Sequence, residues 1–312
     1  MSRGAGARQS ARRLAGRARR AVGFPFRGAD EPVAHWSMRA ARLAALQRAD
    51  PDPLGEIRDS GDTAVDVVLP VGPRDTEIVD LALDGVGANL RGPIGHIYCI
   101  APQPLCRALT RRYPHVSVVD ENDVCRPPVR RSLEATYGDR AGWMMQQLVT
   151  LSLPEISSAA AAVVIDADTV LVRPRRFRAG KKTLVLAAQE FHVSYYRLLS
   201  AVWQQPLTLP YFSCIAHQMC FVRDDLLSMR GAIEGLWGVS WVDALLACCE
   251  PESRVLSEYE LYGQWRLHRA AAATVVSPMR NAARRRAPGD TVRSLSEASP
   301  RGTYSISFHW YL

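Results

Sequence analysis

A strand-length run of apolar residues ends in two carboxylates that are one residue apart. Residues 160–165 read Ala-Ala-Ala-Val-Val-Ile, and Asp166 and Asp168 follow directly. A run that is apolar on both faces is typical of a strand in a parallel sheet, because helices cover both faces of such a sheet. Alternation along the chain would place the two aspartates on the same side. The run therefore predicts an α/β fold with an acidic site at a strand's carboxyl end, where open α/β sheets bind ligands.

Further apolar runs alternate with segments of helical periodicity. We expect strands at residues 65–71, 96–100, 116–119, 182–188 and 304–308, and helices at residues 35–48, 76–90, 142–153 and 224–233. Such alternation is typical of a mostly parallel sheet flanked by helices. With 312 residues, of which 47% are hydrophobic, the chain is large enough to bury the core that this fold requires.

The positive charge of the chain is concentrated in its first 27 residues. The net charge is +8, and this segment alone carries eight arginines and no acidic residue, which leaves 31 basic and 31 acidic residues elsewhere. We predict that residues 1–27 form a basic tail with little structure of its own, which could contact an anionic membrane. Because the rest of the chain is neutral, no nucleic-acid partner is expected. Residues 28–62 are expected to form a short helix and a linker, and residues 63–312 the main domain.

Neither targeting nor disulfide patterns are evident. The tail lacks the apolar core of a signal peptide, and no uninterrupted apolar stretch reaches the roughly 18 residues of a membrane span. We therefore expect a cytoplasmic protein that could lie peripherally on the inner face of the membrane. The seven cysteines include no C-x-x-C pair, so buried reduced thiols are expected rather than disulfides or zinc ligands.

The two aspartates are candidate metal ligands. Carboxylate oxygens suit Mg²⁺ or Mn²⁺, which keeps coordination positions open for the oxygens of a diphosphate. His309, at the end of the last expected strand, could add an imidazole ligand for Mn²⁺. The alternatives are a solvated loop for Asp166 and Asp168 and a packed core histidine for His309.

Glu258 is the candidate catalytic residue. The segment Ser257-Glu258-Tyr259-Glu260 fits a capping box at a helix start, which gives Glu260 a structural role. Glu258 would then lie in the first turn, where the helix dipole is expected to keep its carboxylate ionised and able to accept a proton. An exposed acid without function is the alternative.

Other polar residues could contact a nucleotide. Asp75 follows the first expected strand and Asp120 the third, at the edge where a nucleotide would lie, although both could simply form turns. Gln146 and Gln147 lie on one expected helix, where their amides could hydrogen-bond hydroxyl or phosphate oxygens. His217, which interrupts an apolar run, could touch a sugar or a phosphate, although we favour a structural role. The chain contains no dinucleotide-binding fingerprint, P-loop or nucleophile elbow.

Several of these segments together resemble the GT-A glycosyltransferases, which move a sugar from a nucleotide diphosphate to an acceptor. The segments are Val164-Ile165-Asp166-Ala167-Asp168-Thr169, Ser257-Glu258-Tyr259-Glu260-Leu261-Tyr262-Gly263 and Ser307-Phe308-His309. Together with Gly142-Trp143-Met144-Met145-Gln146-Gln147 they are similar to a largely uncharacterised bacterial family of that superfamily. The likeness covers roughly residues 63–312 and implies a GT-A-like, Rossmann-like fold with a single catalytic domain.

The resemblance also implies roles for individual residues. Asp168 would bind Mn²⁺ directly, Asp166 would contact the ribose or reach the metal through water, and His309 would complete the coordination. The substrates would be a UDP- or GDP-sugar and a glycan or glycolipid acceptor. Glu258 would lie near the acceptor and act as the base in an inverting enzyme, whereas a retaining enzyme needs no base.

Two other functions fit parts of the sequence. A haloacid-dehalogenase-type phosphatase would use Asp166 as its nucleophile, with Asp224-Asp225 as its later acidic motif. Some 160 residues precede the supposed nucleophile strand, however, and that fold usually begins there. A non-enzymatic scaffold that binds acidic lipid or nucleic acid would explain the tail but not the carboxylate pair.

Overall fold

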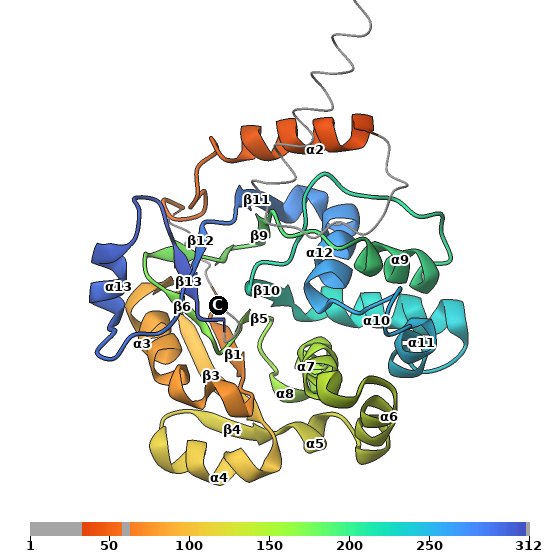
Figure 1. Cartoon of the computed structure of the whole chain (residues 1–312), viewed down its shortest axis with the longest axis horizontal. Coiled ribbons are helices and arrows are strands. Elements are labelled where there is room, and N and C mark those ends of the chain that lie inside the picture. The colour runs from red at the N-terminus through yellow and green to blue at the C-terminus, as the bar shows by residue number, and fades with distance from the viewer. Residues whose placement is uncertain (1–32, 58–62, 310–312) are drawn as a thin grey trace, which may run out of the picture.

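The chain folds around a five-stranded sheet in the order β10-β5-β1-β3-β4 (Figure 1). The computed structural model describes residues 33–57 and 63–309. The strands are β1 (Val65–Pro70), β3 (Ile94–Ala101), β4 (Ser117–Asp120), β5 (Ala161–Ile165) and β10 (Gln218–Val222). β1 runs parallel to β3 and β5, β3 runs parallel to β4, and β10 joins β5 in the antiparallel sense. The predicted mostly parallel sheet is confirmed.

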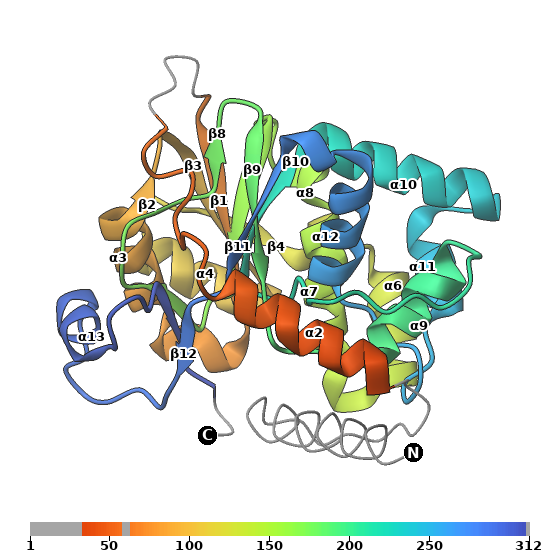
Figure 2. The same cartoon turned by 90° about the horizontal axis from the view of Figure 1, so that it is seen from above.

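Helices cover both faces of this sheet, which explains why β1 and β5 are buried at every position. α3 (Val79–Asn89) and α4 (Gln103–Arg112) lie on one face, and α7 (Ala141–Leu151), α10 (Arg223–Trp237) and α12 (Glu258–Arg269) on the other (Figure 2). Side chains of β5 alternate between the two hydrophobic cores: Val163 and Ile165 pack with α3, and Val164 packs with α7. Each core therefore uses alternate residues of the same strand.

Shorter helices complete the layers. They are α5 (Glu121–Val124), α6 (Pro127–Tyr137), α8 (Leu153–Ile156), α9 (Val193–Val202), α11 (Trp241–Cys248) and α13 (Val292–Ala298), with 3₁₀ turns η1 (Pro73–Glu77), η2 (Gly138–Arg140) and η3 (Ala271–Ala273). The expected helices at 76–90, 142–153 and 224–233 are confirmed within a few residues. Pro154 lies in the first turn of α8, where its missing N–H is tolerated, so it starts a new helical turn.

Three small sheets surround the central one. They are β11-β9-β8, with β11 (Thr274–Pro278), β9 (Lys182–Ala187) and β8 (Arg178–Ala179); β12-β13-β6, with β12 (Asn281–Ala283), β13 (Ser305–Ser307) and β6 (Thr169–Leu171); and β2-β7, with β2 (Leu90–Arg91) and β7 (Arg175–Arg176). In the second of these, Ser307 pairs with Thr169. This pairing brings residues near 307 to the turn that follows β5.

The segment before β1 packs closely on the rest of the chain. α2 (Val33–Leu46) lies beside β11 (Figure 2), and its Arg39 donates a hydrogen bond to the carbonyl of Gln189. Leu54, in the expected linker, is fully buried, and Arg175 donates to the carbonyl of Pro51. The described part of the linker is thus a packed turn, because it supplies an apolar side chain and carbonyl acceptors to the core.

Two further predictions concern the chain as a whole. The predicted basic tail, residues 1–27, lies outside the described residues. Within residues 33–57 and 63–309, no helix combines the length and apolar character needed to cross a membrane. All seven cysteines are free thiols, and five of them are buried, as predicted.

Candidate functional site

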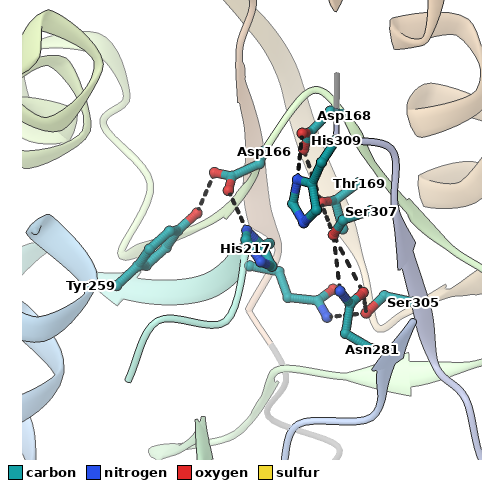
Figure 3. Close-up of polar contacts among 10 residues, drawn as sticks. Asp166, Asp168, Thr169, His217, Tyr259, Asn281, Ser305, Ser307 and His309 are labelled. Carbon is teal, nitrogen blue, oxygen red and sulfur yellow. Dashed lines mark hydrogen bonds and ion pairs between the residues drawn. The ribbon is translucent and has the colours of Figure 1, made fainter. Parts of the chain in front are cut away.

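Asp166 and Asp168 lie in the turn between β5 and β6 (Figure 3). The Asp166 N–H donates to the carbonyl of His217, 2.9 Å away, and the Thr169 N–H donates to the carbonyl of Asp166. These bonds close the turn and tie it to the loop before β10. Because β5 is parallel to β1, the turn lies at the sheet edge where β1 also ends. The predicted position of the acidic pair at a strand's carboxyl end is confirmed.

The carboxylate of Asp166 is held from both sides. Its Oδ1 accepts a hydrogen bond from the hydroxyl of Tyr259 at 2.8 Å, and its Oδ2 lies 3.0 Å from Nδ1 of His217. Tyr259 belongs to α12 and His217 to the loop before β10. Neither residue was predicted to lie in the site, because no local pattern marks Tyr259 as a partner of Asp166, which is 93 positions away, or His217, which is 51 positions away. The break that His217 makes in an apolar run was the available signal.

His217 differs from an ordinary core histidine in its backbone and in its charge. Its φ of +55° lies in the left-handed region that non-glycine residues avoid. Burial by itself would lower the pKa of the imidazole, but the hydrogen bond and the negative charge of Asp166 outweigh burial and raise this pKa to about 9. The imidazole is therefore protonated at neutral pH, and it pairs with Asp166 as a cation.

Asp168 contacts the C-terminal segment. Its Oδ2 lies 3.5 Å from Nδ1 of His309, and its carbonyl accepts the N–H of Phe308. The rings of His309 and His217 are 5.2 Å apart, centroid to centroid. The structure thus brings together Asp166, Asp168 and His309, the three residues predicted as metal ligands.

A chain of polar side chains fixes the strand that carries His309 (Figure 3). The hydroxyls of Thr169 and Ser307 are 2.8 Å apart, and Ser307 accepts a hydrogen bond from Asn281. Asn281 in turn accepts from Ser305, whose hydroxyl accepts from Gln218. These residues come from β6, β13, β12 and β10, so the network joins the small sheet to the edge strand of the central one.

Asp75 lies in η1, which follows β1 at the carboxyl edge of the sheet, where it was predicted. Its Oδ2 accepts the N–H of Gly72 at the start of η1. Burial is the main reason why the pKa of Asp75 is raised to about 6, and the negative charges of Asp168 and Asp166 raise it further. Three carboxylates therefore share this edge of the sheet, and their mutual repulsion would be relieved by a cation.

Glu258 is almost fully buried, and the pKa of its carboxyl is raised, whereas the helix dipole alone would lower it. Only 2% of the residue is exposed, and burial, followed by the charge of Asp166, raises the pKa of the carboxyl to about 8. The prediction that this carboxylate is held ionised is wrong, because loss of hydration outweighs the dipole. Its backbone N–H donates to Oε1 of Gln147, which is buried as well. Gln147, predicted to contact a nucleotide, instead holds the start of α12.

Glu260 has a structural role, but with other partners than a capping box provides. Ser257 caps α12 by accepting the N–H of Glu260 at 3.3 Å, as predicted. The Glu260 carboxylate accepts the N–H of Cys214 at 3.0 Å and the hydroxyl of Tyr196 at 2.8 Å. It therefore braces the loop that leads to His217.

Asp120 is not brought to the acidic pair, because β1 and β3 lie between β4 and β5. Asp120 ends β4, the edge strand, and its carboxylate caps α5 by accepting the N–H of Asn122. This is the turn role named as its alternative. Gln146 is half-buried on α7, and its contact with a nucleotide stays a prediction.

The oxygen and nitrogen atoms of the site are suitable ligands for a hard divalent cation, although they are not already arranged around a single point. Asp166, Asp168 and His309 offer carboxylate oxygens and one imidazole nitrogen, the ligands expected for Mn²⁺ or Mg²⁺. Within the described part of the chain, no three acidic, histidine or cysteine side chains already surround one point at coordination distance. The carboxylates are instead engaged by imidazoles and a phenol, so an ion bound by Asp168 and His309 would have to replace the contact between these two side chains.

The acidic motif of the phosphatase alternative lies at the wrong end of the sheet. β10 is antiparallel to β5, with Gln218 beside Ile165 and Val222 beside Ala161. Asp224 and Asp225 follow Val222, so they are at the start of β5 rather than at its end. Asp225 forms an ion pair with Arg266.

The chain is similar to known proteins in structure but not in sequence. No family model and no curated protein matches the sequence. The mouse xyloside xylosyltransferase 1 structure, in its apo form, is 10% identical with a TM-score of 0.44, covering 80% of this chain and 99% of that one. The PaToxG glycosyltransferase is 8% identical with a TM-score of 0.37, covering 77% and 78%. Both are structures of glycosyltransferases, and both TM-scores are below 0.5.

Proposed function

We propose that this protein is a metal-dependent glycosyltransferase that moves a sugar from a nucleotide-diphosphate donor, such as a UDP- or GDP-sugar, to a glycan or lipid-linked acceptor. The observation that carries the proposal is the acidic turn after β5, where Asp166 and Asp168 meet His309 from the C-terminal segment. Asp75, in the turn η1 that follows the neighbouring strand β1, adds a third carboxylate. Negative charge gathered at a sheet's carboxyl edge suits a cation that receives a diphosphate.

In this proposal the chain's own side chains hold and orient the donor. Asp168 and His309 would bind Mn²⁺ or Mg²⁺, and Asp166 would contact the ribose or reach the ion through water. The bound ion would supply positive charge to the departing diphosphate. Tyr259 and His217 fix the orientation of the Asp166 carboxylate. Asp75 lies where it could contact the nucleotide.

The phosphatase alternative is less well supported. It requires a second acidic motif beside the nucleophile, whereas Asp224 and Asp225 lie at the opposite end of β5. It also leaves the contact between His309 and Asp168 without a role.

We further propose that the eight arginines of residues 1–27 bind the anionic inner face of the membrane, where a lipid-linked acceptor would be found. Sedimentation with anionic and neutral vesicles tests this. The full chain should pellet with anionic vesicles only, and deletion of residues 1–27 should abolish pelleting. Equal pelleting of both chains would contradict the proposal.

Thermal unfolding with nucleotides tests the catalytic proposal. The melting temperature would be measured with nucleotide diphosphates and nucleotide sugars, each with and without Mn²⁺. One nucleotide should raise it only when Mn²⁺ is present, because binding to the folded state alone stabilises that state. Asp168→Asn should lose the shift, whereas Asp84→Asn, at an exposed position on α3, should keep it. If no nucleotide shifts the transition and Asp166→Asn abolishes Mg²⁺-dependent hydrolysis of phosphate esters, the phosphatase assignment is correct instead.

A further inference from the structure

A second pair of titratable residues lies beside the acidic turn, in the segment that follows β9. Ala188 and Ser213 form an antiparallel bridge, with both backbone hydrogen bonds present. Residues 189–192 therefore leave the sheet on the side of residues 209–212, which precede the loop to His217. On their other side, Arg39 of α2 donates to the carbonyl of Gln189 and stacks over the ring of Phe191 at 4.3 Å. The segment is thus held in place from two directions.

Within this segment Glu190 and His192 form a hydrogen-bonded pair. Nε2 of His192 lies 2.9 Å from Oε1 of Glu190. The side chain of Glu190 is 40% exposed and that of His192 is 41% exposed. A carboxylate that is oriented by a histidine and also reaches solvent has the geometry that proton transfer to or from a bound substrate needs.

The charges around Glu190 keep it ionised. Burial would raise the pKa of its carboxyl, but the hydrogen bond from His192 and the nearby imidazoles of His217 and His309 outweigh burial and lower this pKa. Burial, followed by the negative charge of Glu190, raises the pKa of the nearby Tyr195 phenol. The same imidazoles lie against Asp166 and Asp168, so Glu190 and the acidic pair have His217 and His309 as common neighbours.

Glu258, in contrast to Glu190, is neither exposed to solvent nor ionised. It is almost fully buried, and its carboxyl holds a proton at neutral pH because burial raises its pKa to about 8. A base must be unprotonated and must reach the proton that it removes. The structure offers Glu190 for this role and places Glu258 within the core.

We infer that Glu190, oriented by His192, removes the proton from the acceptor hydroxyl in the transfer proposed above, on which this inference rests. The O–H bond of the acceptor breaks and its proton passes to the Glu190 carboxylate. The acceptor oxygen forms a bond to the anomeric carbon of the sugar, and the bond from that carbon to the diphosphate breaks, leaving its electron pair on the diphosphate. A single displacement of this kind inverts the configuration of the sugar.

Hydrolysis of the donor, with water as acceptor, tests the inference. The nucleotide sugar with the largest Mn²⁺-dependent thermal shift would be incubated with the full-length protein, and the released sugar followed by NMR. Glu190→Gln should slow release about 10²- to 10⁴-fold while leaving the thermal shift unchanged. Glu297→Gln, at an exposed position on α13, is the matched control and should change neither quantity. The first sugar released should have inverted configuration.

A second pair of variants, at His192, tests whether this residue orients Glu190 or only supports folding. His192→Gln keeps a hydrogen-bond donor and should retain most of the hydrolysis rate, whereas His192→Ala should lose about tenfold or more. Each variant's melting temperature without ligand shows whether it folds. If Glu190→Gln itself does not fold, this pair decides, because equal rates for the two His192 variants would overturn the inference.

The two proposals fail in different ways. If no nucleotide stabilises the wild-type protein, the proposed function fails and the inference fails with it. If the wild-type protein binds a nucleotide sugar but Glu190→Gln releases sugar at the wild-type rate, only the inference is overturned. Retained configuration in the product overturns it as well, and so does bound donor that water does not cleave, because Glu190 is open to water.

Discussion

The backbone of His217 has a left-handed conformation, which lowers the stability of the folded protein although the side chain is needed in the site. A left-handed conformation costs a non-glycine residue about 1–2 kcal/mol, and glycine escapes this cost. We therefore expect His217→Gly to be more stable than His217→Ala by about 1 kcal/mol, measured by urea denaturation. Both variants should lose the Mn²⁺-dependent nucleotide shift, because Asp166 loses its imidazole partner.

Gln204 provides the matched control for this comparison, since its φ is +50° and its side chain is exposed. Gln204→Gly should also be more stable than Gln204→Ala, but both should keep the nucleotide shift. If His217→Ala proved more stable than His217→Gly, that result would contradict the interpretation of the backbone.

Burial of Glu258 predicts a pH-dependent stability. The pKa of its carboxyl is raised from 4.5 to about 8, so the folded state binds the proton more tightly than the unfolded state does. Its contribution to stability is full below about pH 4.5 and is lost as the pH rises towards 8. Glu258→Gln has no carboxyl group to ionise, so the variant should not lose this stability. In the wild type the loss amounts to about 1.4 kcal/mol for each unit by which the pKa is raised. Urea denaturation without metal should show the variant gaining on the wild type between these pH values, and a constant difference would contradict the prediction.

The sequence identified the acidic residues of the site better than their partners. Asp166 and Asp168 could be predicted because a strand pattern precedes them directly. Tyr259 and His217 could not, because their contacts with Asp166 join loops and helices whose spatial order no local pattern encodes. Glu258 was misjudged for a related reason: its burial depends on packing against α7, not on its own helix.

Close packing of α12 makes one of its glycines necessary. A Cβ on Gly263 would lie 2.6 Å from both Cβ and Sγ of Cys214, which is fully buried. We expect Gly263→Ala to destabilise the protein by about 1–3 kcal/mol, although alanine favours helices. Gly231→Ala on α10 is the matched control: a Cβ there meets nothing within 4 Å, so it should stabilise by about 0.5–1 kcal/mol. Chemical denaturation measures both, and a stabilised Gly263→Ala protein would show that the two elements are less tightly packed.

Most helices and long strands followed from their periodicity, whereas the shortest strands did not. β2, β7 and β8 have two residues each, too few to show alternation. The antiparallel direction of β10 was not predicted either, since direction depends on how strands pair and not on their composition. The antiparallel direction of β10 determines which residues meet in the site, because it places the start of β10, and with it His217, at the end of β5.

β13 contributes to the stability of the whole fold as well as to the geometry of the site. Ile306 and Phe308 are buried against Val170 in a core of their own, and each contributes about 1.5–3 kcal/mol by burial. We expect deletion of residues 304–312 to lower the free energy of unfolding by several kcal/mol and to abolish the nucleotide shift. His309→Gln should abolish the shift while changing the stability by less than about 1 kcal/mol, since glutamine is also polar and the imidazole's contact with Asp168 is as long as 3.5 Å. If His309→Gln destabilised the protein as much as the deletion, the histidine would have a structural role instead.

The pairing of Thr169 with Ser307 also has a consequence for synthesis of the protein. The two hydroxyls that join the halves of the site belong to residues 138 positions apart. At about 5–20 residues per second, a ribosome needs on the order of ten seconds to make the intervening chain. During that interval the acidic turn exists without the strand that holds it, so the nascent chain cannot yet assemble the complete site.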